Sequence, residues 1–544
     1  MPRMTGGDAI VEGLIRHGID TLFGLPGVQT YGLFDALARN SNRIRLINAR
    51  HEQTTAYMAL GYACATGRAS AYSVVPGPGV MNTAAALVTA WGVNAPVLCI
   101  TGQVPGPMIG RQRGQLHEMK DQLATLKTLV KHADRIDHPS EAPIKIARAF
   151  QDMLSGRRGP ASIEMPWEQF AAQAEVTPVD PLPALPNPTP DPERIAALAK
   201  LIEAANAPMI WVGGGAAHAS AEILALAEKI GAPVVSFRGG RGIVSDRHPL
   251  GLTVPAALKL WPNTDVLIGI GTRLDVAAGR WADLPAAMKP AALRIARIDI
   301  DPAEMHRLQV DIPIVADSAD GARALTAAVA SKSSDERAAA IAHAKREAWA
   351  ALDTITPQME YLKVIRDVLP ENGILCDEMT QVGYVSWFGF PFYEPRTLVT
   401  SGFSGTLGAG FPTALGVKVA HPDRPVIAVT GDGGFLFGGA DLATAVKYGI
   451  NLVTIVFNNE AYGNVLRDQT RLFLGRESGS ALKNPDFQTF AKSFGVRSWR
   501  VRDGKGLRAA LTDALAANAP VLIEVMTDIT KESSPWEIIF PGRG

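Results

Sequence analysis

The sequence predicts an α/β protein of three consecutive doubly wound domains, each built on a parallel sheet. Short apolar, β-branched runs typical of buried strands alternate with segments of helical periodicity over most of the 544 residues. The alternation is interrupted at residues 175–192 by EVTPVDPLPALPNPTPDP, a proline-dense stretch that indicates a semi-rigid linker. The length is sufficient for roughly three to four domains of about 150 residues each.

Composition places the chain among globular proteins and limits its partners. Hydrophobic residues make up 47% and charged residues 19% of the chain, so we expect large cores and no disorder. The 53 basic and 53 acidic residues balance, which gives no indication of a nucleic-acid or membrane-surface partner. No apolar run approaches the roughly eighteen residues of a membrane span, and the first residues lack the apolar core of a signal peptide.

The three cysteines, Cys64, Cys99 and Cys376, stand far apart in apolar contexts and form no CxxC pair. We expect them to be reduced core residues, as in proteins of the cytosol. Together with the absence of a recognisable targeting segment, this predicts a cytoplasmic protein.

The first block, residues 1–174, alternates strand and helix patterns in the way a parallel sheet requires. Strands are predicted at 21–24, 45–48, 71–75 and 97–101. Helices are predicted at 8–17 and 54–66, and a further helix is expected to open at Asn82.

A second block of the same kind, residues 193–330, is expected to form a central Rossmann-like domain. Its predicted strands are 209–212, 234–237, 266–271 and 294–299, and the first of them ends at three glycines, 213–215. Residues 331–357 read as a charged helix or connector, and a third α/β block covers 358–544.

The most informative stretch is residues 426–463 in the third block. A buried strand at 426–430 ends at Gly431-Asp432-Gly433-Gly434, a helix is predicted at 438–449, and a second buried strand at 451–457 stops at Asn458-Asn459. A strand, crossover helix and strand form a right-handed unit with parallel, neighbouring strands. Asp432 and Asn459 are therefore expected at the carboxyl edge of one sheet, where such folds bind ligands.

The residue types at this edge suit a magnesium-bound diphosphate. One carboxylate and one amide oxygen are ligands that Mg²⁺ accepts alongside water and phosphate oxygens. Gly433 and Gly434 would let backbone N–H groups approach those phosphates. The chain has neither a GK[ST] loop nor a GxGxxG motif here, which excludes the two commonest nucleotide loops. The alternative is an ordinary glycine turn and a pair of capping asparagines.

Gly-Asp-Gly followed by Asn-Asn at this separation resembles the signature of thiamine diphosphate (ThDP) enzymes. The order of the three blocks resembles the acetolactate synthase, benzaldehyde lyase and pyruvate oxidase branch, with a pyrimidine-binding domain (1–174), a linker (175–192), a central domain (193–330), a connector (331–357) and a diphosphate-binding domain (358–544). The resemblance extends over essentially the whole chain. It also rests on Phe23 to Gly27, Arg50 to Glu52, Gly77 to Gly79 with Asn82, and Ile298 to Pro302.

This resemblance implies roles for residues at the coenzyme's tail. Asp432, Asn459 and the carbonyl group of Ala461 match the Mg²⁺ ligands of the family, and the amides of Gly433 and Gly434 match its diphosphate contacts. Further matches to coenzyme-binding positions are Asn82, Thr380, Gln381 and Tyr462.

At the other end of the coenzyme, Glu52 matches the glutamate that hydrogen-bonds the aminopyrimidine N1′ and promotes removal of the C2 proton. Leu407 matches the apolar residue that holds ThDP bent, and Gly405 the residue whose carbonyl meets the 4′-amino group. The alternatives are that Glu52 only supports a helix start and that Leu407 is a core residue in a glycine-rich helix start.

Residues that would face the substrate are less well defined. Gln115 matches a glutamine directed at the reacting carbon, and His117 is a candidate acid or base, although a single histidine on a polar segment is more often simply exposed. Gln29 replaces a histidine of the benzaldehyde lyases, and Gly383 and Tyr384 stand where acetolactate synthases carry a Gln-His pair. These departures leave the substrate open.

The resemblance therefore implies a ThDP- and Mg²⁺-dependent carbon–carbon lyase or carboligase acting on 2-keto acids, or on aldehydes and acyloins. The alternative is a flavin- or nicotinamide-dependent oxidoreductase that uses the central domain. Gly271-Thr272-Arg273 matches one flavin-binding segment of relatives, but residues 251–255 do not match the second, so FAD is not favoured. A third hypothesis, a non-catalytic homologue, would not require Glu52, Asp432 and Asn459 together.

The resemblance also implies a homodimer or homotetramer, because the family forms each active site between the first domain of one subunit and the third domain of another. The other partners it implies are small carbonyl compounds.

Overall fold

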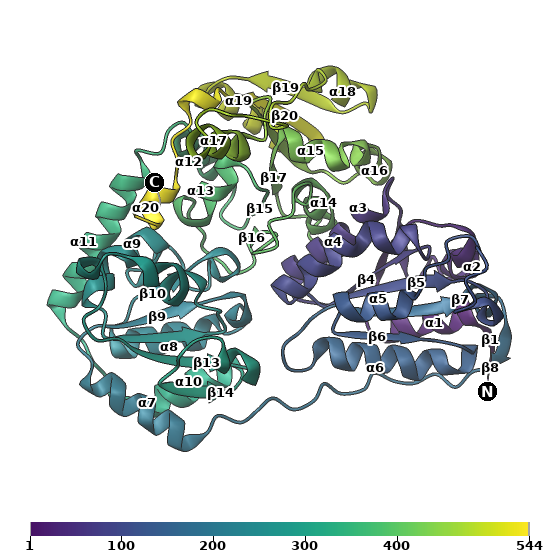
Figure 1. Cartoon of the computed structure of the whole chain (residues 1–544), viewed down its shortest axis with the longest axis horizontal. Helices are drawn as coiled ribbons and strands as arrows, with labels where there is room; N and C mark the ends of the chain where they lie inside the picture. Colours follow the sequence, from purple (N-terminus) through teal and green to yellow (C-terminus); the bar gives the residue numbers. More distant parts are fainter. Residues whose placement is uncertain (1, 542–544) are drawn as a thin grey trace.

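Three parallel sheets of six strands organise the chain, which confirms the predicted fold class (Figure 1). The computed structural model describes residues 2–541. Helices cover the sheets, and the third sheet lies above the other two in the view of Figure 1. No helix within the described residues is both long and apolar enough to cross a membrane.

The first sheet has the strand order β3-β2-β4-β5-β7-β6. Its strands are β2 (Thr21–Gly24), β3 (Arg45–Ile47), β4 (Ser70–Val74), β5 (Val97–Gln103), β6 (His132–Arg135) and β7 (Ala161–Pro166). Its helices are α1 (Gly6–Arg16), α2 (Tyr31–Arg39), α3 (Glu52–Thr66), α4 (Pro78–Val93), α5 (Gln122–Leu129) and α6 (Ala142–Leu154). A separate antiparallel ribbon joins β1 (Arg3–Thr5) to β8 (Gln173–Glu175), so both ends of this unit are paired.

Residues 176–191 contain no helix or strand and run as an extended strap to the second sheet (Figure 1). That sheet has the order β11-β10-β9-β12-β13-β14. Its strands are β9 (Pro208–Val212), β10 (Val234–Ser236), β11 (Gly251–Leu252), β12 (Val266–Ile270), β13 (Arg294–Asp299) and β14 (Ile312–Val315). Its helices are α7 (Pro192–Ala204), α8 (Ser220–Ile230), α9 (Val254–Leu260) and α10 (Ser318–Ala328), followed by the connecting α11 (Asp335–Leu352).

The third sheet has the order β16-β15-β17-β18-β20-β19. Its strands are β15 (Ile374–Asp377), β16 (Leu398–Val399), β17 (Val426–Gly431), β18 (Val453–Asn458), β19 (Arg497–Val501) and β20 (Val521–Met526). Its helices are α12 (Gln358–Val368), α13 (Gln381–Gly389), α14 (Gly410–Ala420), α15 (Asp432–Gly438), α16 (Leu442–Tyr448), α17 (Gly463–Leu472), α18 (Phe487–Ser493), α19 (Gly504–Ala516) and α20 (Trp536–Ile539).

Two predicted helix starts, and one that was considered as an alternative, differ from the structure. A helix begins at Asp432 itself rather than at residue 438, and α16 then ends at Gly449 in the left-handed conformation, with φ of 61°. Pro78 opens α4, since proline suits the first helical turn, and Asn82 therefore lies inside this helix. Residues 405–408 form a loop before α14 rather than a helix start.

Helices α3 and α14 cross in close contact and join the first domain to the third. A Cβ atom added to Gly61 on α3 would overlap the carbonyl oxygen of Thr413, and one added to Gly416 on α14 would overlap the carbonyl oxygen of Met58. The missing side chains thus let one backbone touch the other. Apolar residues of both helices share one buried cluster, which extends across the two domains.

Gly416→Ala should therefore separate the two helices and lower the free energy of unfolding by about 3 kcal/mol or more, because the clash is with backbone rather than with a flexible side chain. Thermal and urea denaturation of the purified variant measure this. Gly279→Ala is the matched control, since nothing lies within 4 Å of the added Cβ atom. Equal stability of the two variants would contradict the proposed role of the crossing.

Candidate cofactor site

Two neighbouring strands of the third sheet bring the predicted metal ligands to one edge. Gly431, the last residue of β17, is paired with Phe457 of β18, so Asp432 and Asn458 leave the sheet side by side. Asn459 follows directly, and its side-chain oxygen accepts a hydrogen bond of 3.2 Å from the backbone N–H of Ala461. The predicted parallel unit, and the edge at which its residues meet, are as the sequence indicates.

The side chain of Asp432 is buried at the start of α15, with 2% of the residue exposed. Burial raises the pKa of its carboxyl group, while a hydrogen bond from Asn484 acts in the opposite direction. The predicted donor set consists of oxygen atoms: one carboxylate, one amide and one backbone carbonyl. Within residues 2–541 no group of three or more His, Cys, Asp or Glu side chains could hold a metal ion. An oxygen-only set of this kind fits Mg²⁺.

Other side chains pack closely against the two glycines that follow Asp432. A Cβ atom on Gly433 would lie 2.6 Å from the ring of Tyr462, and one on Gly434 would overlap the carboxyl group of Glu378. Glycine avoids both overlaps, and it places its backbone N–H groups at the start of α15, a position that suits an anion such as a diphosphate.

Thr380 and Gln381 begin α13 beside this edge. The Thr380 hydroxyl accepts a hydrogen bond of 3.4 Å from the N–H of Gly383 and caps the helix. Gln381 donates to the side-chain oxygen of Asn464 at 3.3 Å. Its own oxygen is buried without a hydrogen-bond partner among the described residues. Such an unpartnered polar atom is the kind of group that a bound ligand or water satisfies.

Glu378 is a site residue that sequence reasoning missed. Its carboxylate accepts hydrogen bonds from the backbone N–H of Gly408 and from the hydroxyl of Thr430. It therefore connects the 405–408 loop to the strand that ends at Asp432. Burial raises the pKa of Glu378 to about 7, against the lowering effect of the Thr430 hydrogen bond. Two adjacent acids at the end of a strand, Asp377 and Glu378, were the available signal.

The 405–408 loop carries Gly405 and Leu407. Gly405 and Gly408 have φ of 56° and 83°, values that favour glycine. Leu407 is only half-buried, which argues against the alternative of a core residue. The Thr406 hydroxyl lies 3.2 Å from that of Thr89 on α4, so the loop is also tied to the first domain.

Glu52 is the first residue of α3. The preceding residue, His51, caps the helix by accepting a hydrogen bond of 3.1 Å from the N–H of Gln53. Asn82, one turn into α4, donates to the carboxylate of Glu52 at 3.1 Å. The structure thus joins two residues that the resemblance assigned separately to the coenzyme, and Asn82 fixes the orientation of Glu52.

Three segments of the chain match models of known protein domains. Residues 4–125 match the thiamine pyrophosphate enzyme N-terminal TPP binding domain, residues 195–325 its central domain, and residues 379–525 its C-terminal TPP binding domain. The probable acetolactate synthase large subunit of Methanocaldococcus jannaschii is 34% identical over 96% of this chain and 92% of its own length.

The chain belongs to the thiamine pyrophosphate enzyme family. The acetolactate synthase of Arthrospira platensis is 31% identical over 99% of the chain and 97% of its own length. The probable 2-ketoarginine decarboxylase of Pseudomonas aeruginosa is 30% identical over 96% of the chain and 94% of its own length. The family resemblance and the prediction of a ThDP-dependent enzyme are both confirmed.

In this thiamine pyrophosphate enzyme, the residues predicted to face substrate lie in the first domain. His117 is half-buried, and its Nδ1 atom lies 3.0 Å from the side-chain oxygen of Gln29. Gln29 in turn donates to the carbonyl of Leu116 at 2.8 Å. The expectation of a simply exposed histidine is therefore wrong. Gln115 is placed two residues earlier, where its N–H donates to Glu118 at 2.9 Å.

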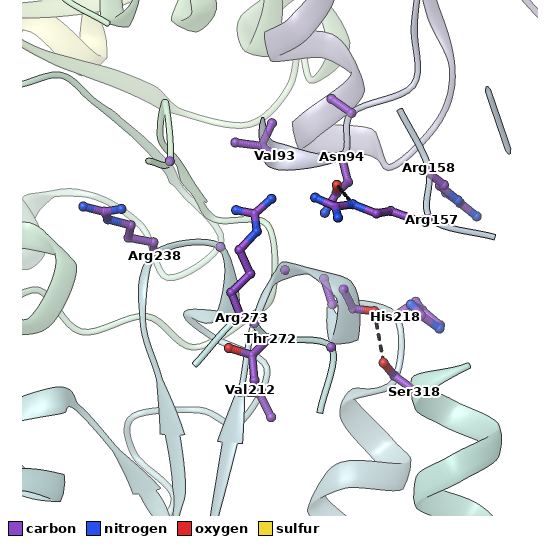
Figure 2. Close-up of a pocket in the computed structure, with 18 of the residues that line it drawn as sticks. Val93, Asn94, Arg157, Arg158, Val212, His218, Arg238, Thr272, Arg273 and Ser318 are labelled. Atoms are coloured by element: carbon purple, nitrogen blue, oxygen red, sulfur yellow. Dashed lines mark hydrogen bonds between the residues drawn. The ribbon is translucent and has the colours of Figure 1, made fainter. Parts of the chain in front are cut away.

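The central domain carries a cavity of about 630 Å³, lined by residues of all three domains (Figure 2). The glycines 213–215, at the carboxyl end of β9, line part of it. Arg238 and Arg273 point into it. Arg238 adopts φ of 48°, stacks 4.2 Å from the Trp387 ring and leaves its Nε atom without a hydrogen-bond partner among the described residues. Burial lowers the pKa of Arg238 to about 10.

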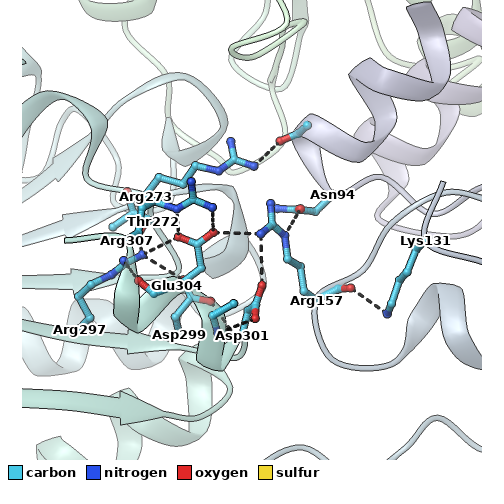
Figure 3. Close-up of polar contacts among 12 residues, drawn as sticks. Asn94, Lys131, Arg157, Thr272, Arg273, Arg297, Asp299, Asp301, Glu304 and Arg307 are labelled. Carbon is cyan, nitrogen blue, oxygen red and sulfur yellow. Dashed lines mark hydrogen bonds and ion pairs between the residues drawn. The ribbon is translucent and has the colours of Figure 1, made fainter. Parts of the chain in front are cut away.

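An ion-pair network at this cavity ties the first domain to the central one (Figure 3). Arg157 donates to Glu304 at 2.9 Å and to Asp301 at 3.2 Å. Burial alone would raise the pKa of Glu304, but hydrogen bonds from Arg307 and Arg297 lower it to about 2. Glu304 therefore remains ionised and holds the domains together across the physiological range.

Glu378→Gln should change the pH dependence of stability. Folding raises the pKa of this carboxyl group from 4.5 to about 7, so its protonated form favours the folded state, and ionisation opposes folding as the pH rises through this window. Relative to the glutamine variant, the wild-type protein should lose about 3 kcal/mol between pH 4.5 and pH values above 7. Urea denaturation at several pH values measures the difference.

Glu193→Gln, on the exposed start of α7, is the control for this experiment. It should track the wild-type protein at every pH. A stability difference between Glu378→Gln and wild type that does not vary with pH would contradict the assignment.

Proposed function

We propose that this protein is a ThDP- and Mg²⁺-dependent carbon–carbon lyase or carboligase acting on 2-keto acids, or on aldehydes and acyloins. The observation that carries the proposal is the oxygen-lined edge of the third sheet, where buried Asp432 and the Asn459 loop meet beside two closely packed glycines. Relatives named acetolactate synthase and 2-ketoarginine decarboxylase support this reaction class.

Asp432, Asn459 and the carbonyl group of Ala461 would hold Mg²⁺, and the backbone amides of Gly433 and Gly434 would bind the diphosphate. Ala461 is fixed for this role because it forms a bridge with Ala481. When bound, ThDP supplies a carbon nucleophile for a carbonyl group and a ring that accepts electrons.

Glu52 would hold the proton at N1′ of the aminopyrimidine. The hydrogen bond from Asn82 occupies one carboxylate oxygen and leaves the other for the coenzyme. Leu407, half-buried on a loop with two left-handed glycines, would support the bent coenzyme from below.

On the substrate side, His117 would hold or release a proton at its ring, while the Gln29 amide fixes the ring orientation through Nδ1. Gln115 would lie near the reacting carbon.

We also propose that the active form is a homodimer or homotetramer with each site between subunits. Exposed apolar side chains on two helices that would contact the coenzyme support this. Their exposed fractions lie between 39% and 53%, and they are Met81, Val88 and Trp91 on α4 and Leu436 and Phe437 on α15. Such a group is typical of a protein interface. Light scattering at assay concentrations should detect a dimer or larger species, and an active monomer would contradict the proposal.

A flavin-dependent oxidoreductase remains the second candidate. The arginine-lined cavity at the glycines 213–215 favours it, because backbone amides and arginines at strand ends bind phosphate groups. The visible absorption of the purified protein decides between an enzyme with and without flavin.

Glu52→Gln should lower kcat by two or more orders of magnitude while ThDP still binds, because an amide cannot hold the N1′ proton as a carboxylate does. Turnover of pyruvate, benzoylformate, benzoin and acetoin, with ThDP binding by calorimetry, provides the measurement. Undiminished turnover would contradict the role of Glu52.

Asp432→Ala is the complementary variant. It should lose Mg²⁺-dependent ThDP binding altogether, since the only carboxylate of the predicted ligand set is removed. A variant that binds ThDP with wild-type dependence on Mg²⁺ would overturn the assignment of the metal site.

A further inference from the structure

A short segment outside the known motifs contacts two of the proposed metal ligands, Asp432 and Ala461. Residues 480–484 follow α17 and its loop and lead into α18. Ala481 forms an antiparallel bridge with Ala461. On either side, the N–H of Tyr462 donates to the carbonyl of Ser480 at 2.8 Å, and the N–H of Leu482 donates to the carbonyl of Glu460 at 2.7 Å. The backbone that carries the Ala461 carbonyl is thereby held as one strand of a small ladder.

The same segment reaches Asp432 through the side chain of Asn484. Its Nδ2 group donates to Oδ2 of Asp432 at 2.6 Å and to Oδ1 of Asn458 at 2.9 Å. An amide nitrogen has two hydrogens, and both are used here, so the side chain is fixed in rotation. Its two acceptors lie 52 and 26 residues away in the sequence.

Asn484 is itself held in a buried polar chain that starts at the surface. Arg500 donates to Glu524 at 2.6 Å, and Glu524, 1% exposed, accepts a hydrogen bond of 2.8 Å from Nδ2 of Asn458. Asn458 thus presents its oxygen, not its nitrogen, to Asn484, and Asn484 can present only its nitrogen to Asp432. The direction of every bond in the chain is fixed by the charged groups at its origin.

These hydrogen bonds restrict the orientation of the Asp432 carboxylate. The χ2 torsion of an aspartate is normally broad, so a free Asp432 could turn both oxygens towards an ion. The 2.6 Å bond to Asn484 restrains this torsion and engages Oδ2, so Oδ1 is the oxygen that a cation can meet without breaking that bond. A carboxylate held in this way binds through one oxygen, as small octahedral Mg²⁺ with ligand distances of about 2.1 Å prefers. Ca²⁺, with six to eight ligands at about 2.4 Å, readily uses both oxygens.

We propose that Asn484 is a positioning residue that holds Asp432 in one-oxygen coordination and thereby makes the site selective for Mg²⁺ over Ca²⁺. The proposal rests on the proposed function, because it takes Asp432 as a metal ligand. In this proposal, residues 480–484 set the geometry of the metal site and need no contact with substrate.

The test is a calorimetric titration of Mg²⁺ and of Ca²⁺ into the full-length protein with saturating ThDP, for wild type and Asn484→Ala. Partners that orient metal ligands typically contribute ten- to a hundredfold to metal affinity. We expect the Mg²⁺ affinity of the variant to fall about tenfold and its Ca²⁺ affinity to fall less, so that the Mg²⁺/Ca²⁺ affinity ratio decreases at least about threefold.

Asn484→Leu keeps the side-chain volume and removes both hydrogen bonds, and it should give the same change in ratio if Asn484→Ala does not fold. Asn451→Ala is the matched control: it removes a surface amide bonded to Asn518 at 2.6 Å, and the ratio should stay at the wild-type value. A lower melting temperature with an unchanged ratio would mean that Asn484 only anchors the loop, which overturns the proposal.

The Asp432→Ala variant distinguishes an error in the role of Asn484 from an error in the proposed function. If Asp432→Ala still shows Mg²⁺-dependent ThDP binding, the metal site itself is misassigned. If Asp432→Ala loses that binding while both Asn484 variants keep wild-type affinities and ratio, the metal site stands and the role of Asn484 is wrong.

Discussion

The crossing of α3 and α14 is the constraint on which the rest of the arrangement depends. Gly61 and Gly416 allow backbone-to-backbone contact between the first and third domains. Glu52 lies nine residues before Gly61, or about 13 Å along the helix axis. A slip of one turn would move Glu52 by about 5.4 Å relative to the third domain. The position of the glutamate relative to that domain is thus set by glycines that are far from it.

At the edge of the third sheet, polar side chains connect segments that are far apart in the sequence. Glu378 links the loop of Leu407 to the strand of Asp432, while Asn484 links Asp432 to Asn458. These groups are all satisfied by partners from other elements, and in a low-dielectric interior such bonds are directional and strong. These bonds restrain the edge, where the strands end and α15 begins.

Much of this could be predicted from the sequence. The neighbouring parallel strands β17 and β18 follow from two buried apolar runs and one crossover, which leave few topologies open. The start of α15 at Asp432 could not be predicted, because Gly433 and Gly434 have low intrinsic helix propensity and tertiary packing of buried Phe435 overrides it. The short edge strand β11, with two residues, has no periodicity to detect.

The polar links within the site were beyond sequence reasoning for a different reason. Asn484 and Asp432 are 52 residues apart, as are Glu378 and Thr430, and no local pattern indicates which distant partner a polar side chain will find. His117 shows the reverse: its polar neighbours in the sequence suggested exposure, whereas Gln29 from another loop encloses it. The motifs indicate where the ends of the coenzyme are expected, but not which side chains hold those motifs in place.

The antiparallel ribbon of β1 and β8 bears on how the chain acquires structure during its synthesis. Residues 3–5 find their partners only when residues 173–175 have left the ribosome, and the first domain can then close while the others are still unmade. Helix α14 follows roughly 235 residues later, a delay of about 10 to 50 seconds at ordinary elongation rates. During that interval the small-residue face of α3 around Gly61 has no partner, so the nascent chain carries an uncovered apolar surface that only its own third domain fits.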